Sequence, residues 1–226
     1  HKRAFIERRL LPLNLPLRER VALEEKLVVS GNPLFKGDYE DFPAVQKKRQ
    51  LILPNRFDWE KRPNLSLDWA YLVKKKDPTV SIVVCTSRPR FTSNRQWLVD
   101  KARYMEEDGI LSIEAGLTKS QYHKLLAESS VMLTNSVEEN FGFCLVESCL
   151  YGTMPLAPYG LSHTEVLGDD SRLLFEPEED LVTKILGLMA NPCHVKHYAE
   201  KYFGAIDRIA AVMRGQTLYG RSPTPT

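Results

Sequence analysis

The chain has 226 residues, 31 of them lysine or arginine and 29 aspartate or glutamate, so its formal net charge is only +2. Hydrophobic residues make up 43% and charged residues 27%, which is typical of a globular protein and argues against intrinsic disorder. No apolar run reaches the roughly 18 residues that suggest a membrane-spanning helix. The central part of the chain is mildly acidic and its two flanks are basic, so broad nucleic-acid binding by the centre is not expected.

Residues 1–49 are expected to connect the main domain to another part of a longer protein. Apolar residues spaced among charged ones predict an amphipathic helix over 1–13 and a second helix from Leu17 to about Glu25. A short strand is predicted at Val28-Val29, before a turn. The chain opens with neither a methionine nor an apolar secretory segment, so we expect a piece of an intracellular protein rather than a secreted precursor.

From Gln50 to about residue 192, predicted strands and helices alternate. The first helix is expected to be capped by Asn64 or Ser66 and the third by Thr118. Predicted strands cover 51–53, 80–85, 110–114, 131–133, 154–157 and 172–175, and predicted helices cover about 64–75, 94–107, 119–128, 143–151 and 179–189. This alternation predicts an α/β fold, a doubly wound parallel sheet of the Rossmann-like kind with right-handed crossovers.

Three further expectations concern packing and the end of the chain. In the helix over 94–107, Trp97 is expected to face inward together with Leu98, Ala102 and Met105. A last helix is predicted from Val195 to Met213. The tail over 214–226 is rich in Pro, Thr, Ser and Gly and is expected to be disordered.

The cysteines and histidines do not predict a metal site. The spacing of the four cysteines matches no zinc pattern, and the spacing of the histidines and carboxylates does not lead us to predict a metal site. We therefore expect reduced, buried thiols in a cytoplasmic protein that binds no metal.

One stretch carries the strongest chemical signal. An apolar strand at 130–134 is followed by a polar turn that contains Glu139, by Asn140-Phe141-Gly142, and then by a helix that contains Glu147. The helix is almost entirely apolar, so it is expected to be buried, and Glu147 then needs a partner. Unpaired N–H groups at the start of this helix would attract anions. Gly152 suits the left-handed position after a helix.

This stretch resembles the signature of glycosyltransferase family 4. The resemblance rests on Glu139 and Glu147 with seven residues between them, Phe141-Gly142 inside the interval, and Gly152 followed by Pro155. Members of that family are retaining enzymes of the GT-B fold, built from two Rossmann-like domains, and they take sugars from nucleotide-sugar donors. The plainer alternative is a buried helix whose Glu147 caps a neighbouring backbone.

A second resemblance lies about 80 residues earlier. Arg56 and Lys61 are five positions apart in the loop that follows the first predicted strand. Two cations at this edge would stabilise the charge that grows on a departing diphosphate, without a metal ion. In the resembled family, a strand-end arginine followed five residues later by a lysine does this. The alternative is a solvated basic loop.

The resemblance also implies roles for other residues. Glu139 would contact hydroxyls of the sugar, and Glu147 would bind the ribose hydroxyls. The remaining donor-binding positions that it implies are Gly116 beside the nucleobase and Asn140, Phe141, Gly142 and Phe143 beside the sugar or phosphates.

Two other loops carry residues that could act at the same edge of the sheet. Arg88 and Arg90, after the second predicted strand, could reach the donor or an acidic acceptor, or have no role. Residues 158–165 read as a loop able to close on the site, with His163 interpreted as a surface histidine. The Leu-Ser-x-x-Glu pattern there is similar to a stretch of the tRNA-queuosine mannosyltransferases.

Together these expectations describe the C-terminal half of a GT-B glycosyltransferase with a helical connector. Residues 50–192 would bind the nucleoside diphosphate sugar, 1–49 would lead from a missing N-terminal domain, and 193–213 would cross back to it. The expected reaction is retaining transfer of the sugar to an unknown acceptor hydroxyl, without a cofactor, and this chain alone should turn over little. Two alternatives remain: a GT-B-fold nucleotide-sugar epimerase, and a non-catalytic domain that binds a nucleotide or a protein.

Overall fold

The computed structural model describes residues 14–26, 34, 36–39, 45–54, 56–204 and 209–211. Residues 37–201 form one compact unit, and residues 1–36 with 202–226 form another. In the second unit, helix α2 (Leu17–Lys26) coincides with the helix predicted from Leu17. The predicted helix over 1–13, the strand at Val28-Val29 and the tail over 214–226 lie outside the described residues. The predicted sugar-nucleotide domain, 50–192, lies inside the larger unit.

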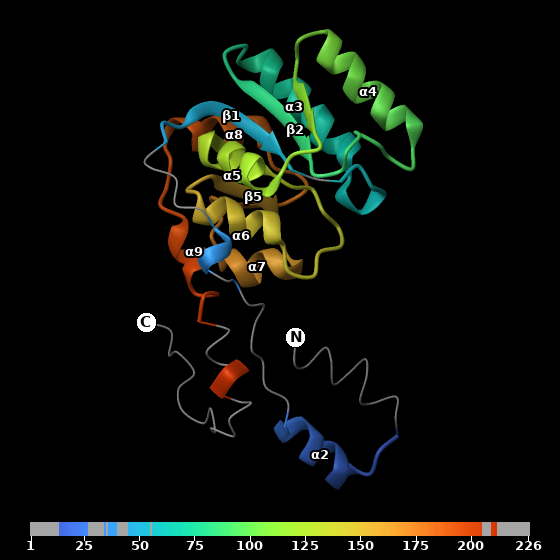
Figure 1. Ribbon diagram of the computed structural model, residues 1–226, viewed down its shortest axis with the longest axis vertical. Coiled ribbons are helices and arrows are strands. Elements are labelled where there is room, and N and C mark those ends of the chain that lie inside the picture. Colours follow the sequence, from blue (N-terminus) through green and yellow to red (C-terminus); the bar gives the residue numbers. More distant parts are fainter. Residues whose placement is uncertain are drawn as a thin grey trace. The chain divides into compact units, whose positions relative to one another are not determined.

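The larger unit is built on a parallel sheet of six strands in the order β3-β2-β1-β4-β5-β6 (Figure 1). The strands are β1 (Lys48–Leu53), β2 (Ser81–Thr86), β3 (Ser112–Ala115), β4 (Ser129–Leu133), β5 (Met154–Pro158) and β6 (Leu174–Phe175). This order confirms the predicted α/β, doubly wound fold. It reverses direction between β1 and β4, and ligands of such sheets bind beyond the strand ends at that switch point.

Helices cover both faces of the sheet (Figure 1). On one face α3 packs against α4 and α8, and on the other α6 packs against α5, α7 and α9. Their bounds are α3 (Pro63–Lys76), α4 (Gln96–Glu107), α5 (Lys119–Glu128), α6 (Phe143–Leu150), α7 (Leu161–Leu167), α8 (Leu181–Ala190) and α9 (Lys196–Glu200). Two 3-10 turns are also present, η3 (Lys36–Asp38) and η4 (Trp59–Lys61).

The centre of the core is the pairing of β1 with β4. Leu51 lies opposite Val131 and Ile52 opposite Met132, and all four side chains are fully buried. An apolar run buried on both faces is what a central parallel strand requires. This register brings the carboxyl ends of the two strands to the same level, so the loops that follow them lie side by side.

The structure tests the predicted helix caps and the predicted inward face of α4. The capping box of Thr118 and Gln121 at the start of α5 confirms the predicted cap. The predicted caps of α3 are wrong, because the helix begins at Pro63, a residue whose fixed φ suits the first helical position. Trp97 is half exposed rather than buried, since the inward face of α4 is formed by Leu98, Ala102 and Met105.

Two segments differ from the predicted secondary structure. The segment expected to be a loop over 158–165 becomes helix α7 from Leu161 onward. The continuous helix predicted from Val195 to Met213 is also wrong: α9 ends at Glu200 and a turn follows over 201–204. At this point the Lys201 ammonium donates to the carbonyl oxygens of Glu165 and Val166, near the end of α7.

Candidate functional site

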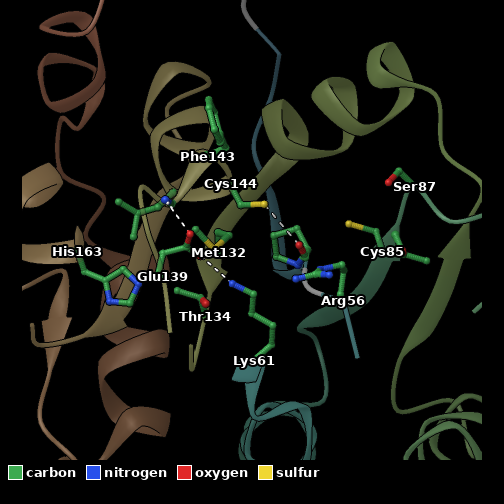
Figure 2. A pocket seen from close by; sticks show the side chains of 14 residues that line it. Arg56, Lys61, Cys85, Ser87, Met132, Thr134, Glu139, Phe143, Cys144 and His163 are labelled. Atoms are coloured by element: carbon green, nitrogen blue, oxygen red, sulfur yellow. Dashed lines mark hydrogen bonds and ion pairs between the residues drawn. The ribbon is translucent and has the colours of Figure 1, made fainter. Parts of the chain in front are cut away.

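The loops after β1 and β4 are joined to each other at the switch point. The Lys61 Nζ atom, from η4, lies 2.8 Å from the Glu139 Oε2 atom (Figure 2). The backbone also connects the loops, because the Val137 N–H donates to the Glu60 carbonyl at 2.8 Å. The predicted cation of one loop and the predicted carboxylate of the other are therefore brought together.

Glu139 uses both of its carboxylate oxygens. Oε2 accepts from Lys61, and Oε1 accepts from the Gly142 N–H at 3.0 Å. Burial alone would raise the pKa of Glu139, but the hydrogen bond and charge of Lys61, with the N–H groups of Gly142 and Phe141, lower it below its usual value. Glu139 is therefore ionised at neutral pH and balances the charge of Lys61, whose side chain is only 13% exposed.

Arg56 lies at the edge of the same site with a side chain that is 55% exposed. Its guanidinium contacts the Asp58 Oδ2 atom at 3.2 Å and the Glu60 Oε1 atom at 3.0 Å. Asp58 also receives a hydrogen bond from Arg88, at 3.1 Å. An anionic ligand at Arg56 would therefore compete with two carboxylates of its own loop, in a setting where surface ion pairs are weak.

A cavity of about 310 Å³ opens between these groups (Figure 2). Its floor is formed by the ends of the central strands and its walls by the loops that follow them. Its polar or charged lining includes Arg56, Lys61, Ser87, Thr134, Glu139 and His163, and the start of α6 adds Gly142, Phe143 and Cys144. We call this the first cavity.

A second cavity, of about 330 Å³, adjoins the first. The two share the lining residues Pro54, Cys85, Thr86, Ser87 and Cys144. The second cavity adds Leu117, Thr118, Lys119, Tyr122 and Glu147. Arg56 and Lys61 thus line one of two neighbouring cavities, and Glu147 lines the other.

Glu147 has a side chain that is 13% exposed, and its Oε1 atom lies 3.9 Å from the His123 Nε2 atom. That separation is longer than a hydrogen bond. His123 is 1% exposed, and its Nε2 atom has no hydrogen-bond partner among the described residues. The ring of Tyr39 stacks on His123 with centroids 5.5 Å apart. The carboxylate of Glu147 is therefore mostly buried, and its oxygens can still accept hydrogen bonds from a ligand.

The other predicted donor-binding residues are placed differently from one another. Gly142, at φ +82°, and Phe143 line the first cavity. Phe143 is half exposed, so the expectation that the whole helix is buried is wrong at its first residue. Phe141 is buried against Phe143 with ring centroids 4.9 Å apart, and Asn140 is exposed in the turn. Of the four, the structure brings two to the cavity wall.

Gly116 serves the turn after β3. Its N–H donates to the Arg88 carbonyl at 2.7 Å, its φ is +70°, and an added Cβ would lie 3.6 Å from the Pro89 Cα atom. The residue that lines the second cavity at this point is its neighbour, Leu117. The close approach that the glycine permits is therefore to the loop after β2.

His163 was interpreted as a surface histidine, and that interpretation is wrong. It is 1% exposed, lies on α7 and lines the first cavity (Figure 2). Burial lowers its pKa, and the hydrogen bond to the Pro158 carbonyl only partly offsets this. The spacing of His163, Val166 and Leu167 is that of a buried helix face, and this periodicity could have revealed its position.

Within the described part of the chain, no group of three or more His, Cys, Asp or Glu residues is arranged to hold a metal ion. No described helix is both long and apolar enough to cross a membrane. Cys85, Cys144, Cys149 and Cys193 are free, and two of them, Cys85 and Cys149, are buried.

Comparison with known proteins assigns the chain to a family. The family described as "Glycosyl transferases group 1" matches residues 38–202, which is most of the chain and the whole of the sheet. The chain belongs to the group 1 glycosyltransferases. A curated relative of this group 1 domain is tRNA-queuosine alpha-mannosyltransferase of Drosophila melanogaster, with 22% identity over 206 residues, 90% of this chain and 50% of the relative. The chain thus spans about half the length of that relative.

Solved structures similar to this group 1 domain are GT-B glycosyltransferases, as expected from the sequence. They include TarM of S. aureus (TM-score 0.62, 18% identity, 89% of this chain and 42% of that one) and the pneumococcal O-GlcNAc transferase GtfA, crystallised with UDP and GlcNAc (TM-score 0.63, 15% identity, 78% and 37%). Another is Anabaena HepE in complex with UDP and glucose (TM-score 0.60, 16% identity, 75% and 49%). At these identities the likeness establishes the fold of the domain.

Proposed function

We propose that this domain is the donor-binding part of a retaining glycosyltransferase and holds a nucleoside diphosphate sugar across the two neighbouring cavities. The observation that carries the proposal is the Lys61–Glu139 pair, which joins the loops after β1 and β4 at the switch point of the sheet. A cation, a carboxylate and a helix start converge on a cavity of a size that suits a sugar diphosphate.

The diphosphate would lie in the first cavity. The bond between the anomeric carbon and the phosphate oxygen breaks, and its electron pair goes to that oxygen. The acceptor hydroxyl oxygen bonds to the same face of the anomeric carbon, and its proton goes to the departing phosphate. Lys61, Arg56 and the first N–H groups of α6 would stabilise the charge that grows on the phosphate, and such preorganised groups need no divalent metal.

The nucleoside would lie in the second cavity. Ribose hydroxyls would donate to the Glu147 carboxylate, which stands 3.9 Å from His123 and has capacity for short hydrogen bonds. Leu117 would form an apolar wall for the base. A carboxylate this poorly exposed gains most from a ligand that completes its hydrogen bonds.

The acceptor is proposed from the relative. The Drosophila protein is named as a tRNA-queuosine mannosyltransferase. The alignment with it covers 90% of this chain. Leu161-Ser162 and Glu165 keep the pattern that resembles this group of enzymes. We therefore propose mannose as the sugar and a modified nucleoside of tRNA as the acceptor. The free cysteines suit the reducing environment of the cytoplasm, where such an acceptor is found.

A transfer assay with the full-length protein tests the proposal. Nucleoside diphosphate mannose and glucose would each be supplied with and without tRNA, and the anomeric configuration of the product would be read by NMR. Transfer with the donor's configuration retained is the expected result. An inverted product would contradict retention. Sugar released or isomerised without tRNA would favour the epimerase, and binding of donor without any reaction would favour a non-catalytic domain.

A further inference from the structure

His163 is a buried polar side chain in the first cavity for which the proposed chemistry has no role so far. The residue lies in the first turn of α7, and its ring lies beside Glu139 (Figure 2). It is 1% exposed as a whole residue, so it is part of the cavity wall rather than of the outer surface.

The orientation and tautomer of the ring are fixed by the end of β5. The His163 Nδ1 atom lies 2.9 Å from the Pro158 carbonyl oxygen. A carbonyl only accepts, so Nδ1 carries the proton. Because burial also lowers the pKa of His163, the ring is neutral at neutral pH. The Nε2 atom therefore bears a lone pair, and none of the described residues donates a hydrogen bond to it.

Three of the polar side chains around His163 are already engaged by other protein groups. Glu139 accepts from Lys61 and from the Gly142 N–H, and Arg56 is held by Asp58 and Glu60. The Thr134 hydroxyl shares a hydrogen bond with the Ser136 hydroxyl at 3.0 Å. His163 Nε2 is thus an acceptor that the protein has positioned and left for a ligand.

We propose that His163 is a specificity-determining residue that accepts a hydrogen bond from one hydroxyl of the donor sugar through Nε2. The inference rests on the proposed function and deepens it, since it assigns the sugar end of the donor to the α7 wall. The ring is tied to Pro158 and cannot follow a differently shaped sugar. A site built to pair with a hydroxyl discriminates strongly against an analogue that lacks it.

The test uses the full-length protein, a nucleoside diphosphate sugar that it transfers, and the 2-, 3-, 4- and 6-deoxy analogues of that donor. In the wild type, one analogue should lose about 10- to 100-fold in kcat/KM, because the acceptor is then left unpaired. In His163→Leu, kcat/KM for the parent donor should fall by a similar factor. For that same analogue, kcat/KM should be no lower with His163→Leu than with the wild type. Ser162→Ala is the matched control, because Ser162 is the buried neighbour of His163 in the chain and lines neither cavity.

Three results would overturn the inference. One is an equal loss for every donor in His163→Leu, with the ratios of the wild type preserved. Another is the same change of ratios in Ser162→Ala. To separate this from failure of the proposed transfer, calorimetry would compare each sugar nucleotide with the free nucleoside diphosphate. If the protein transfers no sugar, but its affinity for the sugar nucleotide still depends on one hydroxyl and on His163, the inference holds. The third contradicting result is a sugar nucleotide that binds no more tightly than the free nucleoside diphosphate.

Discussion

Lys61 and Glu139 form an ion pair of 2.8 Å between residues that are 78 positions apart in the chain. Each residue stands in the loop after one of the two strands where the order of the sheet reverses. The pair therefore links the part of the sequence that resembles a diphosphate-binding loop with the part that resembles a sugar-binding turn.

Replacing Lys61 by alanine is expected to abolish donor-dependent transfer by the full-length protein and to change stability little. The pair is partly exposed, so its loss should lower the free energy of unfolding by about 1 kcal/mol, a shift of a few degrees in Tm. Transfer kinetics and thermal melting measure the two effects. Lys101→Ala, which removes a surface ion pair with Asp68, is the matched control and should leave transfer intact. A collapse of the fold in Lys61→Ala alone would mean that Lys61 is structural.

The same pair predicts a dependence of stability on pH. The pKa of Glu139 is depressed in the folded state, so its contribution is complete above the ordinary pKa of a glutamate and is lost as the pH falls through the lower folded value. Urea unfolding of the wild type and of Glu139→Gln would be compared across the acid range. The wild type should exceed the variant by a constant margin above about pH 5. That margin should shrink below it. A margin that grows on acidification would contradict the assignment.

Glu147 is expected to contribute to binding of the ribose hydroxyls and not to the stability of the fold. Glu147→Gln should weaken binding of a nucleoside diphosphate by about 10- to 100-fold, since a hydrogen bond to a charged acceptor is lost. Calorimetry with the ribose ligand and its 2′,3′-dideoxy analogue checks this. The dideoxy ligand should bind equally to both proteins. Glu138→Gln, in the exposed turn that precedes α6, should bind like the wild type.

Two glycines give opposite predictions for the same substitution. Gly142 has a φ of +82°, which an alanine adopts only with strain, so Gly142→Ala should destabilise by about 1–2 kcal/mol and weaken donor binding. Gly187 lies inside α8 with nothing within 4 Å of an added Cβ, so Gly187→Ala should stabilise by about 0.5–1 kcal/mol. Chemical denaturation measures both. Equal effects at the two sites would refute the account of Gly142.

The sequence was sufficient for the fold and for the residues that meet at its switch point. Short apolar runs such as Leu51–Leu53 and Val131–Leu133 suit strands buried on both faces, and their alternation with predicted helices favours a parallel sheet. Arg56, Lys61 and Glu139 were found from spacing and resemblance, because their loops follow adjacent strands. Each of these features is local in sequence.

What the sequence did not reveal depends on contacts between distant segments. His163 was missed because the helix that buries it begins at Leu161, directly after Gly160, and both residues have a positive φ, so a turn signal suggested a continuing loop. The engagement of the Gly116 N–H by the Arg88 carbonyl depends on how two loops approach each other. Trp97 was misplaced because a large apolar side chain at a helix start need not face the core.

The most direct measurement is a calorimetric titration that compares a nucleoside diphosphate with the corresponding monophosphate. If Lys61 and Arg56 bind the second phosphate, the wild type should bind the diphosphate at least about 10-fold more tightly than the monophosphate. Lys61→Ala should remove most of that difference and leave the affinity for the monophosphate unchanged. Equal affinity of the wild type for the two ligands, or a preference that survives Lys61→Ala, would contradict the account.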